Sequence, residues 1–160
     1  MKILLIIGLI IFILYNAFFI WLNKEVPESI SETSYISKNK FGVTWPFTVI
    51  CLISAVCIFP LWVTVTPEFY QFVVFLSCAG MMFAGCSPLF KEKFEGTIHY
   101  TSGIVAFAAG LAWLLLMGQW ITLGLIALLG GIRTLFQKEK YTFIFEVISY
   151  IAVAITILLL

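Results

Sequence analysis

The stretch "MKILLIIGLIIFILYNAFFIW", residues 1–21, decides the fold class. After Lys2 it stays apolar for about the 20 residues that an α-helix needs to cross a bilayer core. Its apolar residues do not alternate with polar ones, which argues against a membrane β-barrel. A secretory signal peptide has an apolar core of about 7 to 15 residues and a small-residue cleavage site, and this stretch shows neither feature. We therefore expect a retained first membrane span.

The rest of the chain has the same apolar character. Of its 160 residues, 62% are hydrophobic and only 11% are charged, whereas an ordinary soluble domain has about 45 to 50% apolar residues. The composition therefore predicts an integral membrane protein. The net charge is only +1, and the few charges fall in short loops, which excludes nucleic acid as the expected partner.

Apolar segments separated by charged, proline or turn residues divide the chain into six predicted spans. They lie at about 3–22, 45–65, 69–90, 97–117, 120–136 and 142–160. The fifth is the shortest, with Gly124, Gly130 and Gly131 inside it. No repeat or flexible linker interrupts the chain, so we expect residues 1–160 to form one all-α transmembrane bundle.

The charged residues gather on one predicted side of the membrane. Eight of the nine basic residues lie in or beside the loops that follow the first, third and fifth spans: Lys24, Lys38, Lys40, Lys91, Lys93, Arg133, Lys138 and Lys140. Seven of the eight glutamates, all except Glu68, lie on the same side. The positive-inside rule places these loops in the cytoplasm. We expect a multi-pass protein of the cell membrane, a bacterial inner membrane, with both termini non-cytoplasmic.

Glu146 is the charged residue that lies deepest in a predicted span. It follows Tyr141 by five residues, which places it roughly 7 Å into its helix. Ionisable groups inside spans tend to face a partner or a water-filled cavity, and Ser149 and Tyr150 are placed to share that neighbourhood. The alternative is that Glu146 reaches outward and pairs with a basic residue such as Arg133. Both interpretations stay open.

His99 and Arg133 are further candidate site residues on the same side. His99 is the only histidine and stands at the start of the fourth span, where it is an acid/base, a metal ligand or a polar group at a helix end. Arg133 lies near the end of the fifth predicted span. There it either anchors the helix at the membrane interface or binds a carboxylate or a lipid phosphate.

The first loop contains the polar stretch "VPESISETSY", residues 26–35, with Glu28 and Glu32. The loop is about 20 residues long and lacks a strong helical or strand period. Long loops without structure of their own are often functional or disordered. This one either covers the mouth of a cavity or is a solvated linker.

No cofactor or metal site is predicted. Cys51, Cys57, Cys78 and Cys86 lack the C-x-x-C spacing of zinc and redox motifs, and we expect them to fill the core. One histidine and no aspartate exclude a three-histidine metal site. Two small-xxx-small pairs, Gly80 with Ala84 and Ala106 with Gly110, predict close helix packing, with a homodimer seam as the alternative.

The segment "FAGCSPLFKEKFEGTIHYTSGIVAFAAG", residues 83–110, resembles a family of small bacterial six-helix membrane proteins. That family is distantly similar to the alkaline-ceramidase-like (CREST) superfamily of membrane hydrolases. The resemblance depends on Gly85, Pro88, His99 and Gly103, and more loosely on Ile30 and Glu32 in the first loop. It implies a helical bundle with its site at one membrane side. The ceramidase zinc site is built from three histidines, a serine and an aspartate. This chain has one histidine and no aspartate, so the zinc-dependent activity is not implied.

Together these observations predict a polytopic membrane protein with a one-sided polar cavity. We expect the cavity to bind a membrane lipid through its head group, or a small polar ligand, rather than to catalyse a reaction. The predicted ligand-binding residues are His99, Arg133, Glu146, Tyr150, Glu28 and Glu32. One alternative is a small transporter or an accessory subunit that docks on another membrane protein. A second is a lipid hydrolase-like enzyme that uses His99 or Glu146 as its acid or base.

Overall fold

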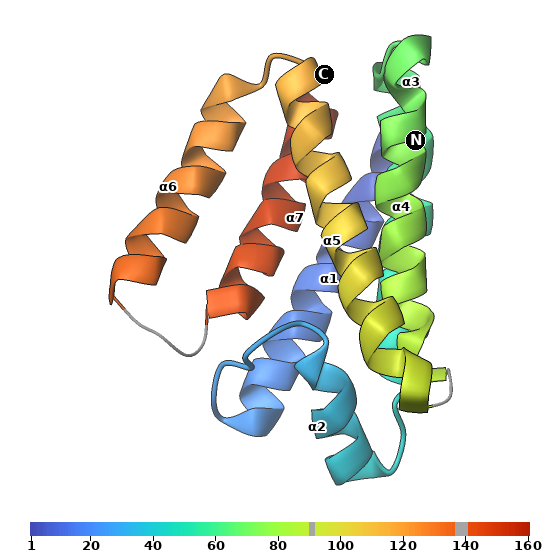
Figure 1. The fold of residues 1–160 in the computed structure, drawn as a ribbon, viewed down its shortest axis with the longest axis vertical. Coiled ribbons are helices and arrows are strands. Elements are labelled where there is room, and N and C mark those ends of the chain that lie inside the picture. The colour runs from blue at the N-terminus through green and yellow to red at the C-terminus, as the bar shows by residue number, and fades with distance from the viewer. Residues whose placement is uncertain (90–91, 137–140) are drawn as a thin grey trace.

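The protein is a bundle of long helices with one short helix across its end (Figure 1). Its structure is a computed structural model that describes residues 1–89, 92–136 and 141–160, and the side chains of residues 89, 92–95, 129–136 and 141 are outside that description. The α-helices are α1 (Lys2–Asn23), α2 (Glu32–Phe41), α3 (Trp45–Val65), α4 (Gln71–Cys86), α5 (Glu92–Leu116), α6 (Trp120–Phe136) and α7 (Tyr141–Leu159). Two 3₁₀ turns, η1 (Glu68–Tyr70) and η2 (Ser87–Leu89), flank α4.

Five of these helices are long and apolar enough to cross a membrane: α1, α3, α4 with η1, the 96–116 part of α5, and the 142–159 part of α7. Within the described residues α6 is not among them. It has 17 residues, about 26 Å at 1.5 Å per residue, which is less than a hydrocarbon core of about 30 Å. The helices lie within a few residues of the six apolar segments of the sequence.

Helix α2 corrects the expectation that the first loop has no structure of its own. Its inward face contains Thr33, Ser34, Ile36 and Ser37, all buried. Three of these four residues carry hydroxyl groups, so the face has almost no hydrophobic period for a sequence pattern to reveal. The helix ends at Gly42, whose φ of 73° favours glycine and whose N–H donates to the Lys38 carbonyl.

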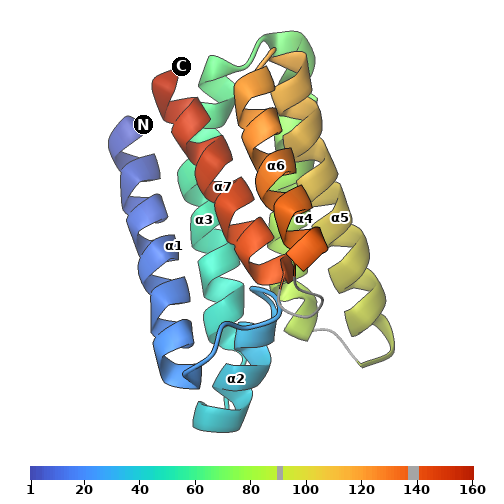
Figure 2. The same cartoon turned by 90° about the vertical axis from the view of Figure 1, so that its left-hand side faces the viewer.

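The two chain ends lie at one end of the bundle and α2 lies at the other (Figures 1 and 2). Helix α4 packs on both α3 and α5, α1 packs on α3, and α6 packs mainly on α7. The segment that joins α1 to α3 therefore lies across the bundle end where α7 begins (Figure 2).

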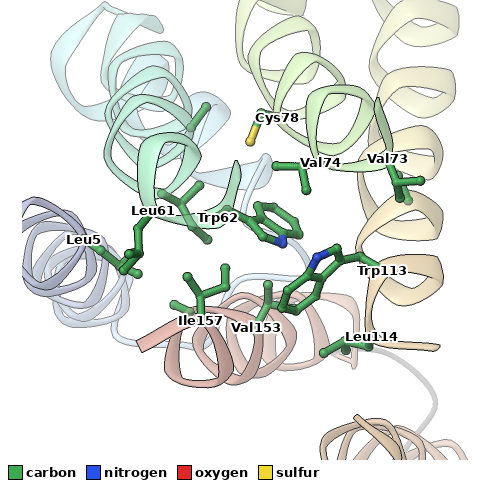
Figure 3. Close-up of a cluster of buried hydrophobic side chains, with 14 of the residues drawn as sticks. Leu5, Leu61, Trp62, Val73, Val74, Cys78, Trp113, Leu114, Val153 and Ile157 are labelled. Atoms are coloured by element: carbon green, nitrogen blue, oxygen red, sulfur yellow. The ribbon is translucent and has the colours of Figure 1, made fainter. Parts of the chain in front are cut away.

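The hydrophobic core is centred on two buried tryptophans (Figure 3). The rings of Trp62 in α3 and Trp113 in α5 meet edge to face with centroids 5.4 Å apart, a favoured geometry for aromatic pairs. The Trp113 Nε1–H donates to Thr66 Oγ1 at 2.8 Å, and the Thr66 hydroxyl donates to the Trp62 carbonyl. Leu5 of α1 and Ile157 of α7 belong to the same buried cluster (Figure 3).

Small residues allow the helices to approach closely. A Cβ on Gly80 of α4 would lie 2.7 Å from the Ala106 backbone N and 2.7 Å from the Ser102 carbonyl O of α5, and Ser77 Oγ donates to the Ala106 carbonyl at 2.8 Å. The small residues Gly80 and Ala106 thus pack against each other within one chain.

Two cysteines fill spaces that glycines leave. Cys57 of α3 contacts the position where Gly8 of α1 has no side chain, and Cys51 does the same opposite Gly85 of α4. All four cysteines are free thiols. Cys51 and Cys57 therefore act as small packing residues, as the sequence predicts.

Candidate functional site

A cavity of about 890 Å³ lies between α3, α4, α5 and α7, within the usual range for ligand pockets of about 300 to 1,000 Å³. One helical face of α7 lines it through Thr142, Phe145, Glu146, Ser149, Tyr150 and Val153. One face of α3 lines it through Phe47, Ile50, Cys51, Ser54, Ile58 and Trp62. Both sets repeat with the i, i+3, i+4 spacing of a single helix face.

The cavity is long and opens along α5. Its lining on α5 runs from Gly96 to Leu111, about 22 Å along the helix axis. Tyr100 and Ile104 belong to this lining and yet are 72% and 68% exposed. The opening is thus at the side of the bundle, between apolar side chains, and not only at its end.

The residues before α2, together with its first turn, cover the end of the cavity, and two of them form hydrogen bonds with α7. The Phe143 N–H, in the first turn of α7, donates to the Glu28 carbonyl at 2.8 Å. The Ile30 N–H donates to Glu146 Oε2, also at 2.8 Å. The first bond satisfies one of the N–H groups that every helix start leaves unpaired. We call residues 28–35 the cover, because they line the cavity and are hydrogen-bonded across it.

Local hydrogen bonds fix the shape of the cover. The Glu32 N–H donates to Ser29 Oγ at 3.2 Å, and the Glu28 N–H donates to the Glu32 carboxylate. These two bonds fold the residues before α2 around Glu32, the first residue of that helix. The buried Thr33 then joins the cover to α1, since its hydroxyl pairs with the Tyr15 hydroxyl at 2.7 Å.

His99 stands at the mouth of the cavity on α5. Its Nδ1 lies 3.0 Å from Ser87 Oγ and 3.4 Å from the Ala84 carbonyl O. Because the Ser87 hydroxyl donates its one hydrogen to the same Ala84 carbonyl, this network assigns the His99 hydrogen to Nδ1.

The middle of the cavity has polar atoms without partners. Tyr150 stacks on Phe12 with ring centroids 4.2 Å apart, and its hydroxyl donates to the Ser54 carbonyl at 3.4 Å. In contrast, Ser54 Oγ, Ser149 Oγ and Trp62 Nε1 are buried and have no hydrogen-bond partner within the described residues. Buried polar groups are rarely left unpaired, so the Ser54 and Ser149 hydroxyls on the cavity wall are unsatisfied hydrogen-bonding groups.

Five of the six predicted site residues line this one cavity: His99, Glu146, Tyr150, Glu28 and Glu32. Their roles differ, because the Glu32 carboxylate is engaged in the cover, whereas Glu28 contributes its backbone and exposes its side chain. The side chain of Arg133 lies outside the described residues, and so do Lys138 and Lys140. Glu146 lines the cavity, whereas the alternative that it pairs with a basic residue such as Arg133 falls on side chains outside the described residues.

Sequence reasoning missed Ser54 and Trp62 as lining residues. Serine and tryptophan are common in apolar helices, and nothing in their spacing distinguishes them from residues that pack against a neighbour. The helical spacing of Ser149 and Tyr150 from Glu146 did mark part of this polar cluster.

Among the described residues, no group of three His, Cys, Asp or Glu side chains is placed to hold a metal ion. Comparisons with known protein families, with characterised proteins and with solved structures find no significant match. The resemblance to the alkaline-ceramidase-like superfamily therefore stays a prediction.

Proposed function

We propose that the protein is a polytopic membrane protein that binds a lipid in this cavity. The head group lies beneath the cover, near Glu146 and His99, and an acyl chain extends along the apolar part toward Ile58 and Trp62. The charged side of the bundle, with the cover, faces the cytoplasm, and both termini face the opposite compartment.

The side opening along α5 is the observation that carries this proposal. Ile104 follows the first residue of α5 by twelve positions, about 18 Å along the helix, and is exposed beside the cavity. An opening at that depth in an apolar helix faces acyl chains rather than water when the helix spans a membrane. A lipid enters such a site sideways without leaving the bilayer.

The lining supports an amphipathic ligand over a small polar solute. Apolar and aromatic side chains form most of the wall, while Glu146, His99 and the unpaired serine hydroxyls lie toward or below the cover. Ligand sites typically combine such a wall with a few polar groups that fix orientation.

Native mass spectrometry of gently extracted protein tests the proposal. We expect the wild-type protein to carry one tightly held lipid, and expect His99→Ala and Glu146→Gln each to weaken its retention. Glu68→Gln, at the opposite end of the bundle, is the matched control and keeps the lipid. Wild-type protein that carries no lipid, or equal retention in all variants, contradicts the proposal.

The same measurement separates the two alternatives. An accessory subunit predicts a co-purifying protein, and a small transporter predicts a bound soluble solute in place of the lipid. A hydrolase-like enzyme predicts that the bound lipid is converted to a product with time, and that His99→Ala stops this conversion.

A further inference from the structure

The charge of the cavity lining bears on the chemistry of the head group. The charged residues along the described lining are Glu28, Glu32 and Glu146, and no Lys or Arg is among them. Glu146 lies five residues after the start of the long helix α7. Its Oε2 accepts the Ile30 N–H, and its Oε1 has no hydrogen-bond partner in the described part of the chain. A carboxylate in apolar surroundings requires a counter-charge or further donors.

Two unpaired hydroxyls lie further along the same cavity. Ser149 is one turn beyond Glu146 on the same face of α7 and is 6% exposed. Ser54 on α3 is 1% exposed, and the bond from the Tyr150 hydroxyl to the Ser54 carbonyl joins these two helices at that level. Both Oγ atoms lack a partner, so both are unsatisfied hydrogen-bonding groups of the cavity wall.

We propose that the head group bound here carries a protonated primary amine, an inference that rests on the proposed lipid binding. An ammonium group has three N–H donors and no acceptor, which complements one carboxylate and neighbouring hydroxyl oxygens. A quaternary ammonium carries the same positive charge but has no N–H donors. An anionic head group without an amine is repelled by the negative charge of the Glu146 carboxylate. The structure therefore favours an aminophospholipid as the ligand. A soluble molecule with a primary amine is the other ligand that offers the same ammonium group.

Competitive lipid binding measured by native mass spectrometry tests this inference. Delipidated protein is mixed with equimolar phosphatidylethanolamine, phosphatidylcholine and phosphatidylglycerol of identical acyl chains, and separately with free phosphoethanolamine. One charge-assisted hydrogen bond contributes about 1.5 to 3 kcal/mol, so we expect phosphatidylethanolamine to be preferred by roughly tenfold or more. Glu146→Gln keeps an acceptor for the Ile30 N–H and thus keeps the cover, but we expect it to lose the preference. Glu68→Gln retains it.

The outcomes distinguish this inference from the proposed function. If phosphatidylcholine or phosphatidylglycerol binds as well as phosphatidylethanolamine, or if Glu146→Gln keeps the preference, the amine inference is wrong while lipid binding stands. If no lipid binds, the proposed function fails as well. Binding of free phosphoethanolamine without any lipid supports the ammonium site and refutes a lipid as its source.

Discussion

At the scale of single residues, the two carboxylate oxygens of Glu146 differ. Oε2 accepts the Ile30 N–H and so holds the cover, and Oε1 is the oxygen that we propose binds the ligand. The sequence indicated this residue as a candidate because a charge inside an apolar helix is energetically costly and is usually kept for a function. It did not identify the Ile30 N–H as a partner, because a backbone donor 116 positions away leaves no trace in a residue pattern.

Removing the Glu146 carboxylate altogether loosens the cover. In Glu146→Ala the Ile30 N–H loses a charged acceptor, a bond that contributes about 1.5 to 3 kcal/mol. We expect amide hydrogen exchange in residues 28–35 to become roughly ten- to a hundredfold faster, with the remaining helices unchanged. Glu68→Ala is the control. Unchanged exchange in the cover contradicts the role assigned to Oε2.

At the scale of elements, the sequence predicts the position of the long helices but not that of α2. Continuous apolar stretches identify the long helices, and Trp45–Val65 and Trp120–Phe136 begin and end where the apolar pattern does. Helix α2 is held by hydroxyl contacts and by the Gly42 cap at its C-terminal end, which hydrophobic periodicity does not reveal.

Two buried hydroxyl residues of α2 are expected to respond differently to mutation. Thr33 and Ser37 are both fully buried, but Thr33 pairs with Tyr15 and Ser37 Oγ has no described partner. Thr33→Val leaves the half-buried Tyr15 hydroxyl without this partner, at a cost of about 1 kcal/mol, whereas Ser37→Ala is neutral or stabilising. Limited proteolysis of the segment between α1 and α3 measures both. Equal cleavage of the two variants contradicts this assignment.

The contact between α4 and α5 requires glycine at position 80. In Gly80→Ala the added methyl group meets backbone atoms of Ser102 and Ala106, which have no rotamer to change, so the helices are forced apart. We expect a lower melting temperature in detergent. Gly124→Ala on α6 is the matched control, because a Cβ there meets nothing within 4 Å, and alanine favours the helix. Similar melting of both variants argues against the close α4 and α5 contact.

At the scale of the whole molecule, the arrangement of helices gathers the polar chemistry at one end. The cover and the start of α7 lie at the end opposite both termini (Figures 1 and 2). The charge pattern predicts this one-sidedness, because most charges fall in the loops that follow the first, third and fifth predicted spans. In a chain of six spans these three loops lie on one side and both termini lie on the other. The depth and side opening of the cavity depend on which helices pack together, and the pattern of apolar and charged residues along the chain does not reveal that.

The orientation in the membrane follows from the positive-inside rule and has its own test. A reporter enzyme fused after Leu160 is expected to behave as non-cytoplasmic, and one inserted near Lys40 as cytoplasmic. The reverse result leaves the cavity in place but turns its cover toward the other compartment.

The most direct test of the central claim, that a lipid occupies the cavity, is to fill the cavity and count bound lipid. Gly103 of α5 lines the cavity, Gly124 of α6 is not among its lining residues, and a Cβ at either position meets nothing within 4 Å. Gly103→Trp and Gly124→Trp thus add the same side chain inside and outside the site. In native mass spectra we expect Gly124→Trp to retain the lipid of the wild-type protein and Gly103→Trp to lose it while staying folded. Equal lipid retention in the two folded variants contradicts the claim.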